Sequence, residues 1–471
     1  MKRLTTLAAL AVLVSGCGEH SNGTAQAPAA GEGTQTTSSC TLRQRQDWAL
    51  QQLSDWYLFP ETLPAALDPA GFDSVGAYVD ALTATARGQR RDRYFTYVTS
   101  IAEEEAFYRS GASAGFGIRL TIDGPARHVF VIEAFEGAPG IAAGLDRGTE
   151  ILAIGAPGEP LRPVAEIIAV EGNGGVTAAL GPSTAGTART LRIADAAGTR
   201  EVTVAKADFA IPPVSPRYGI RIIDDGGRRV GYINLRTFIS TADDPLRAAT
   251  AQLRAAGITE VIVDLRYNGG GLVSTAELLG DLLGGARSRN EVQSHTVFRA
   301  SKASENRTRT YEPRSQSIAP TRIAFIGTEG TASASELVIN ATRPYLRGNA
   351  ALVGSNTYGK PVGQIARDRE ECDDRLRVVA FATQNAARQG DYFEGLAPVM
   401  ESTCQAADDP GFAPGDPREA STRAALDFLA GRGCTPIAGG QTTQAAGGRG
   451  RLRLLTPDQP SAAQREVPGL F

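Results

Sequence analysis

The sequence predicts a multidomain protein of the α/β and α+β classes, with a small helical domain near the N-terminus, a β-rich domain and an α/β core. Apolar residues recur at helical spacing between Leu42 and Trp56, which indicates the helical domain. Short strand-like runs alternate with glycine turns over residues 112–206, and strand-like and helix-like stretches alternate beyond residue 230. At 471 residues, with 42% hydrophobic and 21% charged residues, the chain is long enough for two or three domains.

Residues 1–17 have the pattern of an export signal, with a basic start and an apolar run that is too short to span a bilayer. Residues 13–17 resemble a bacterial lipobox, which implies cleavage before Cys17 and acylation of its thiol. Gly18 is not the aspartate associated with inner-membrane retention, so we expect a lipoprotein of the outer membrane facing the periplasm. The alternative is an ordinary signal peptide with an incidental cysteine.

The next two segments differ sharply in composition. Residues 18–39 are small and polar, cannot bury enough apolar surface to fold, and are predicted to be a flexible tether. Residues 40–111 are predicted to form the helical domain, with a second helix over residues 75–86. Trp48 and Trp56 are expected to anchor this domain, although an aromatic patch for a partner is the alternative.

The β-rich region, residues 112–206, carries the sequence Gly115-Phe116-Gly117-Ile118 at the start of a strand. Together with the glycine-rich helix of residues 137–148, it resembles a PDZ domain. The resemblance implies that these four residues bind a peptide: the loop amides hold its carboxylate, and the next strand pairs with its backbone. A helix over residues 163–170 would form the other wall of the groove. The alternative is a small β-domain without a ligand.

The α/β core is predicted over residues 207–435, and its most informative stretch is residues 330–336. This stretch follows a strand-like run, residues 323–327, and precedes a helix, so Ser333 lies at a strand-to-helix turn beside free backbone N–H groups. Such a turn suits a nucleophile, although helix capping by Ser333 or Ser335 is the commoner use of serine. A second strand-like run, residues 351–354, leads to Lys360, which is boxed between glycine and proline.

The histidine inventory favours lysine as the catalytic base. Of the three histidines, His20 lies in the polar tail, and His128 and His295 stand in plain strand-like contexts. Catalysis by a serine and a lysine is what this inventory permits. An unperturbed lysine has a pKa of about 10.4, and lowering it to near 7 corresponds to about 4 kcal/mol of desolvation or hydrogen bonding. A buried lysine at a sheet edge could meet that requirement.

Three motifs carry a family resemblance: residues 331–336, residues 358–364, and the strand and glycine turn of residues 261–271. They resemble the C-terminal processing (tail-specific) peptidases, the S41 serine peptidases. The resemblance implies that Ser333 is the nucleophile, Lys360 the general base and Gln364 the residue that orients the lysine. It also implies an oxyanion hole built from the backbone N–H of Ala334 and of one glycine, either Gly270 or Gly271.

Cysteine usage agrees with export. If Cys17 is acylated, four cysteines remain, and four cysteines allow three disulfide pairings. The favoured pairing joins Cys372 with Cys404 and Cys40 with Cys434. None of the spacings resembles a metal site, and neither a metal nor another cofactor is predicted.

The net charge of −3 gives no electrostatic case for a nucleic-acid partner, and the basic stretch of residues 286–317 is predicted to be a solvated loop or hairpin. Residues 436–471 are predicted to be a poorly ordered tail. The chain is thus expected to be a membrane-tethered serine endopeptidase that recognises proteins or peptides by their C-terminus; the sequence leaves its oligomeric state open. The alternative is a catalytically silent lipoprotein that binds peptides in the PDZ-like groove.

Overall fold

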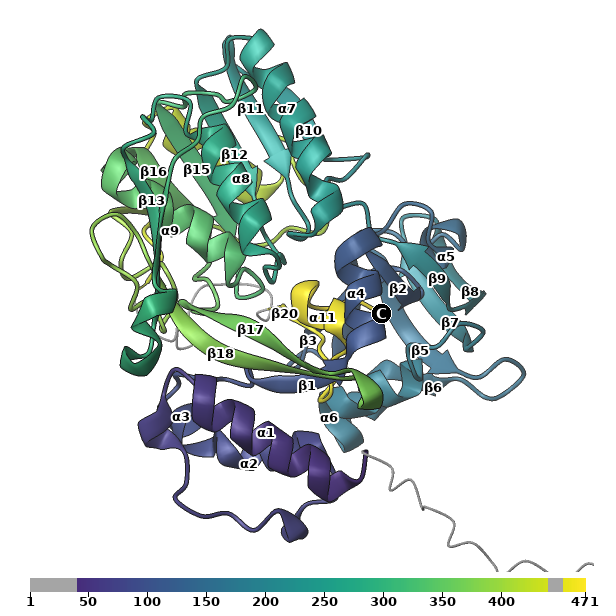
Figure 1. Ribbon diagram of the computed structural model, residues 1–471. Coiled ribbons are helices and arrows are strands. Elements are labelled where there is room, and N and C mark those ends of the chain that lie inside the picture. Colours follow the sequence, from purple (N-terminus) through teal and green to yellow (C-terminus); the bar gives the residue numbers. More distant parts are fainter. Residues whose placement is uncertain (1–39, 439–451) are drawn as a thin grey trace, which may run out of the picture. The chain divides into compact units, whose positions relative to one another are not determined.

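The computed structural model describes residues 40–438 and 452–471 (Figure 1). Cys17, the predicted signal and the predicted tether lie outside the described residues. Among the helices that are described, none is both long and apolar enough to cross a membrane.

The N-terminal helices pack onto a β-sheet of the core. Their bounds are α1 (Leu42–Trp56), η1 (Pro60–Thr62), η2 (Pro69–Gly71), α2 (Val75–Leu82) and α3 (Ala84–Gly88). Thr41 caps α1 with a capping box. Leu53 and Tyr78 share a buried cluster with Leu376 and Val378 of that sheet, and Trp48 and Trp56 lie against the same cluster. These helices therefore need the core sheet to bury their apolar face.

That sheet has five antiparallel strands, in the order β1-β18-β13-β14 with β17 also paired to β18. The bounds are β1 (Tyr97–Ser100), β13 (Val292–Phe298), η4 (Ala300–Glu305), β14 (Arg307–Thr310), β17 (Val362–Arg369), η6 (Glu370–Cys372) and β18 (Asp374–Gln384). The basic stretch is thus the hairpin β13–β14, as predicted. β17 follows Lys360 directly and contains Gln364, so the sheet carries one side of the candidate site.

The β-rich domain, residues 112–206, follows α4 and forms a sheet of order β3-β4-β5-β7-β8 with β6 on β5, to which β20 (Arg453–Leu454) adds beside β3. The elements are α4 (Ile101–Ser110), β2 (Ala112–Gly115), β3 (Ile118–Asp123), β4 (His128–Ala134), α5 (Pro139–Ala142), β5 (Glu150–Gly155), β6 (Arg162–Pro163), α6 (Val164–Leu180), β7 (Ala188–Asp195), β8 (Gly198–Ala205) and β9 (Ala207–Ala210). The helix predicted from residue 163 is α6. Ile118 and Leu120 of β3 share one buried cluster with Ile167 of α6.

The α/β core is a six-stranded sheet of order β10-β11-β12-β15-β16-β19, parallel except for the β10–β11 pair. The bounds are β10 (Ile220–Asp225), β11 (Arg228–Asn234), η3 (Ser240–Ala242), α7 (Asp243–Ala255), β12 (Glu260–Asp264), α8 (Val273–Leu283), β15 (Arg322–Gly327), α9 (Ala334–Leu346), η5 (Arg347–Asn349), β16 (Ala350–Gly354), β19 (Ser402–Gln405) and α10 (Ala420–Leu429). Successive residues of β15 face opposite sides of the sheet: Phe325 packs in the cluster with α7, α8 and α9, and Ile326 packs in the cluster with α10. Helices therefore cover both faces, and the parallel strands end at one edge.

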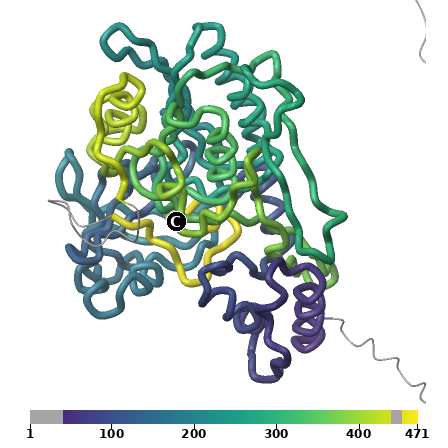
Figure 2. Tube along the Cα trace, turned by 90° about the vertical axis from the view of Figure 1, so that its left-hand side faces the viewer, coloured from purple at the N-terminus to yellow at the C-terminus, as the bar shows by residue number. Residues whose placement is uncertain are grey.

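The prediction of a poorly ordered C-terminal tail is wrong for residues 452–471, which we call the C-terminal segment (Figure 2). It contains β20 (Arg453–Leu454) and α11 (Ala462–Glu466). β20 pairs with β3, and Leu455, Val467 and Leu470 are buried. The segment is ordered by packing against residues far away in the chain. No local repeat in this glycine- and proline-containing stretch predicts that order. Of the rest of the predicted tail, residues 436–438 are described and Ile437 is buried, whereas residues 439–451 lie outside the described residues.

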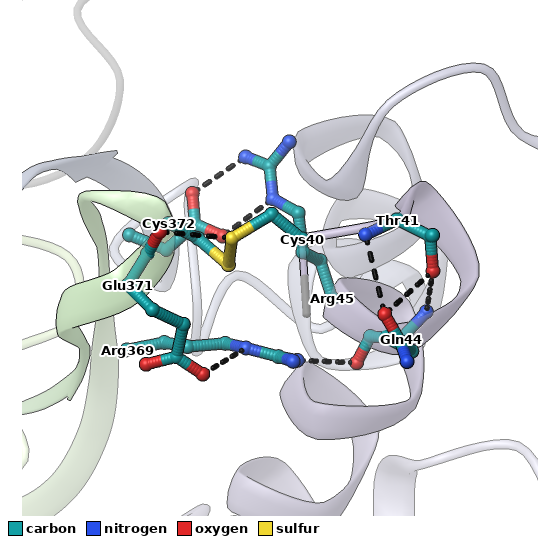
Figure 3. The surroundings of a disulfide bond; sticks show 8 residues. Cys40, Thr41, Gln44, Arg45, Arg369, Glu371 and Cys372 are labelled. Atoms are coloured by element: carbon teal, nitrogen blue, oxygen red, sulfur yellow. Dashed lines mark hydrogen bonds and ion pairs between the residues drawn. A yellow bond between two sulfur atoms is a disulfide. The ribbon is translucent and has the colours of Figure 1, made fainter. Parts of the chain in front are cut away.

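The favoured disulfide pairing is also wrong. One bond joins Cys40 with Cys372 (Figure 3). The other joins Cys404 with Cys434. The turn between β17 and β18 brings Cys372 to the start of α1, where Arg45 donates to Asp374 at 2.5 Å. Sequence spacing could not show this, since the two cysteines are 332 residues apart.

Candidate active site

Ser333 occupies a strained turn between β15 and α9. Its backbone has φ 53° and ψ −113°, in a region that residues with a Cβ rarely adopt. Such strain is found at sites where a side chain must be presented in one orientation. The hydroxyl is half-buried, and α9 begins with the next residue, Ala334.

Hydrogen bonds fix the Ser333 turn against the glycine turn that follows β12. Thr331 Oγ1 donates to the carbonyl of Leu265 at 2.8 Å, and Ser335 Oγ donates to the carbonyl of Asn268 at 2.9 Å. A Cβ added to Gly270 would lie 2.8 Å from Ser333 Cβ, closer than two such carbons approach in real structures. Glycine at position 270 is what allows the two turns to meet.

Two backbone N–H groups in these turns are available to a ligand. The Gly270 N–H already donates to Asn268 Oδ1 at 3.0 Å. Within residues 40–438 and 452–471, no hydrogen bond is donated by the N–H of Gly271 or of Ala334. Of the two glycines predicted for an oxyanion hole, Gly271 is therefore the one whose donor is free.

The carboxylate of Glu336 connects the serine turn with the lysine loop. It is fully buried and accepts from Ser333 N at 3.0 Å, Lys360 N at 2.7 Å, Gly359 N at 2.7 Å and Thr357 Oγ1 at 2.6 Å. Burial raises the pKa of Glu336, and these hydrogen bonds act in the opposite direction with a smaller effect. Sequence reasoning placed Glu336 in the first turn of the helix and assigned it no role in the site. The Ser-x-x-Glu spacing was nevertheless a signal for the contact with the Ser333 N–H.

Lys360 follows β16 and points its ammonium at a neutral partner. Its Nζ donates to Gln364 Oε1 at 2.9 Å and lies 5.1 Å from the centre of the Phe95 ring. Gln364 is itself anchored by its Nε2, which donates to the carbonyl of Phe95. Burial lowers the pKa of Lys360, while the carboxylates of Glu466 and Asp92 act in the opposite direction.

The lysine and the serine are close but not directly bonded. The N–H groups of Ser333 and Lys360 share one oxygen, Glu336 Oε2. In the described part of the chain, no hydrogen bond joins Lys360 Nζ to Ser333 Oγ. Long or absent catalytic hydrogen bonds are common before a substrate binds.

The two described histidines, the alternatives to a lysine base, make their hydrogen bonds with other residues than Ser333. His128 Nδ1 pairs with Glu150, and His295 Nδ1 lies 2.9 Å from Thr308 Oγ1. His20 lies outside the described residues.

A buried ionic network, which sequence reasoning missed, stabilises the end of β12. Arg266 Nε donates to Asp264 Oδ2 and its Nη2 to Glu419 Oε2, both at 2.9 Å, and all three side chains are buried. Arg147 of the β-rich domain joins the network through Asp408, 2.8 Å from its Nη2. Buried charges are tolerated when they are paired in this way. Asp264 and Arg266 stand in one of the three motifs, whereas nothing in the sequence points to Arg147.

The residues predicted to bind a peptide lie between β2 and β3, where they already have a partner. The N–H groups of Gly117 and Ile118 donate to the carbonyl oxygen of Phe471 at 2.9 and 3.2 Å. The side chains of Phe116 and Ile118 are buried, and a Cβ on Gly115 would lie 2.8 Å from the carbonyl carbon of Phe471.

An open cavity of about 3010 Å³ lies beside the catalytic turns. Lys360, Ala332 and Gly269 are among its lining residues, as are Thr121 and Leu454. The cavity is large enough for an extended chain, and Lys360 forms part of its wall.

Part of the chain is similar in sequence to known peptidases. Residues 229–398 match peptidase family S41. The chain is 27% identical over 326 residues to carboxyl-terminal-processing peptidase 3, chloroplastic, of Arabidopsis thaliana, covering 66% of this chain and 57% of the relative. It is also 27% identical over 252 residues to a carboxyl-terminal-processing protease of Picosynechococcus sp., covering 53% and 55%.

A solved structure assigned to the S41 proteases, from Bacteroides fragilis, has the same fold, with a TM-score of 0.63 and 23% identity over 82% of this chain and 97% of that one. The chain spans somewhat more than half the length of the curated relatives it matches. Residues 229–398, which contain Ser333, Lys360 and Gln364, therefore form a domain of peptidase family S41.

Proposed function

We propose that this protein is a serine endopeptidase of the C-terminal processing type, with Ser333 as nucleophile and Lys360 as general base. The observation that carries the proposal is the shared Glu336 carboxylate, which holds the backbones of both residues. The lowered pKa of Lys360 supports a lysine that is neutral, and so able to accept a proton, at lower pH than usual.

The reaction follows from the positions of the groups. Lys360 Nζ accepts the proton of Ser333 Oγ while that oxygen attacks the scissile carbonyl carbon. The N–H groups of Ala334 and Gly271 donate to the oxyanion that forms. Lys360 then gives its proton to the leaving amine, and water hydrolyses the acyl-enzyme by the same steps. Gln364 orients Lys360 without adding a charge, so the lysine pKa stays low.

We further propose that the protein is exported and tethered to the outer membrane through acylated Cys17, facing the periplasm. Its substrates are proteins or peptides whose C-terminus is held by the β-rich domain, which we take to be PDZ-like. Within residues 115–118, the N–H groups of Gly117 and Ile118 support this assignment, because both donate to the main-chain oxygen of Phe471.

The test uses the purified protein with an unfolded protein that has an apolar C-terminus, and with a serine-directed fluorophosphonate probe. We expect fragments of the substrate and a label that maps to Ser333, and we expect both to disappear in Ser333→Ala. Cleavage that survives in Ser333→Ala would refute the proposed nucleophile. Peptide binding without cleavage or labelling would favour a silent peptide-binding lipoprotein.

The role of Gln364 predicts opposite pH shifts in two variants. The Gln364→Glu carboxylate would stabilise the ammonium form of Lys360, raising its pKa, so the rising limb of kcat/KM against pH moves to higher pH. Gln364→Met removes an acceptor that favours the charged form of Lys360, so the pKa of the lysine falls and the limb moves to lower pH. The pH profiles of the three proteins check this, and a Gln364→Glu limb that coincides with the parent's would contradict it.

A further inference from the structure

The C-terminal segment, residues 452–471, occupies the free edge of β3 along almost its whole length. Phe471 N–H donates to the carbonyl of Ile118 at 2.9 Å, and Leu120 N–H donates to the carbonyl of Gly469 at 2.8 Å. Further along, Leu454 is the register partner of Thr121 in the β20–β3 pair. Residues 469–471 thus add to β3 as an antiparallel strand, the way an extended peptide adds to a sheet edge.

Apolar side chains of the segment fill the space beside this edge. Leu470 is 2% and Phe471 3% exposed. Phe471 belongs to the buried cluster that contains Phe116, Ile118 and, from α6, Ile167. Burying apolar side chains of this size favours the bound position of the segment. The groove between β3 and α6 is therefore filled by a peptide that belongs to the chain itself.

The same segment reaches the catalytic turns. A Cβ on Gly330, in the loop that carries Ser333, would lie 2.4 Å from Leu454 Cδ1, so the two are in close contact. The Gly269 N–H, in the glycine turn, donates to the carbonyl of Glu466 at 3.0 Å. The segment thus lies against both turns that form the site.

Glu466 also affects the lysine. Its carboxylate is buried and accepts from Tyr108 Oη at 2.9 Å. The negative charge of Glu466 favours the protonated form of Lys360 and raises its pKa, in opposition to burial. Burial remains the larger effect, so the pKa of Lys360 is still lowered, and Lys360 Nζ is bonded to Gln364 Oε1.

We propose that residues 452–471 are an internal ligand of the peptide groove that keeps the peptidase latent until a substrate peptide displaces them. The ligand class follows from the occupant: an extended peptide with a small residue followed by two large apolar residues, as in Gly469-Leu470-Phe471. A ligand within the same chain competes at an effective concentration of about millimolar, so a free peptide must bind tightly or be abundant to replace it. This inference rests on the proposed function for its catalytic consequence, but the occupancy of the groove can be tested without catalysis.

The experiment measures binding of a fluorescent peptide with the sequence of residues 464–471 to the whole protein carrying Ser333→Ala. Leu470→Asp/Phe471→Asp expels the segment, because two carboxylates cannot be buried unpaired in its place. We expect this variant to bind the peptide at least tenfold more tightly than the parent. The matched control is Thr456→Asp/Gln459→Asp, which adds the same charges at exposed positions of the segment and is expected to bind as the parent does.

Phe471→Ala serves as a second, milder variant. This substitution keeps the backbone hydrogen bonds and removes only the ring, and its expected gain in affinity is about threefold. Thermal unfolding shows which variants fold. If the aspartate variant does not fold, the alanine variant decides. Equal peptide affinity of the parent and the folded variants would overturn the proposal.

Cleavage then separates this inference from the proposed function. With Ser333 restored, kcat/KM for an unfolded protein is expected to rise at least tenfold in the aspartate variant over the parent and the control. A gain in peptide binding with no cleavage by any of the proteins would refute the proposed function and retain the internal ligand. Cleavage at the same rate by the parent and the variants would support the proposed function and refute the latency of the parent.

Discussion

Lys360→Met is expected to lower kcat for peptide cleavage by about a thousandfold, the scale of a lost general base. Methionine fills the same space beside Phe95 but cannot accept the proton of Ser333 Oγ. KM and the melting temperature are expected to change little. The charge of the lysine is buried, and the lysine forms no ion pair within 4 Å among the described residues, so replacing it breaks none. The measurement is kcat and KM with a quenched fluorescent peptide.

Lys302→Met is the matched control for this variant. Lys302 Nζ pairs with Asp55 at 2.8 Å, and its loss is expected to leave kcat within about twofold of the parent value, as is usual for a partly exposed ion pair. Both comparisons are repeated in the Leu470→Asp/Phe471→Asp background, so that a latent parent does not hide the effect. A Lys360→Met protein that turns over as fast as the parent would remove this lysine from the mechanism.

Glu336→Gln is expected to weaken both catalysis and stability. The carboxylate accepts four hydrogen bonds, two on each oxygen, and the amide keeps only one accepting oxygen. Two buried donors then face an NH₂ group, and each unsatisfied donor costs about 1–3 kcal/mol. We expect the free energy of unfolding to fall by about 2–4 kcal/mol, and kcat to fall about a hundredfold as the serine and lysine turns separate.

Urea unfolding and steady-state kinetics test this together. Because Glu336 positions other groups and does not touch the substrate, KM is expected to change much less than kcat. The exposed Glu370→Gln is the control and is expected to change neither stability nor kinetics. Unchanged kcat in Glu336→Gln, with the protein folded, would show that the link between Ser333 and Lys360 does not depend on this carboxylate.

Local sequence patterns predicted much of the core. The alternation of apolar runs and helical stretches after residue 230 predicted α7, α8 and the strands around them, because each element repeats its own short period. The strand-to-helix turn predicted the setting of Ser333, and the same pattern located Lys360 beside a buried strand. These are contacts between neighbours in the chain, and short patterns encode them.

Other parts of the site depend on contacts that no sequence pattern shows, whether the residues are near or far apart in the chain. The choice of Gly271 as the free donor depends on Asn268 Oδ1, which occupies the Gly270 N–H. The disulfide between Cys40 and Cys372 depends on how β17 and β18 fold back toward α1. Counting the cysteines or glycines in the sequence does not show which of them meet these partners in the folded chain.

The sequence by itself determined the class of the core, the two turns that carry Ser333 and Lys360, and the glycine loop of residues 115–118, because each rests on local backbone preferences and short apolar periods. Only the tertiary structure decided that Glu336 joins the two turns, and that residues 469–471 add to β3 in the groove. The physical reason is that a buried carboxylate and an added strand are both stabilised by partners that come together only when the chain folds. Such contacts close long loops, and local composition does not show which residues will meet.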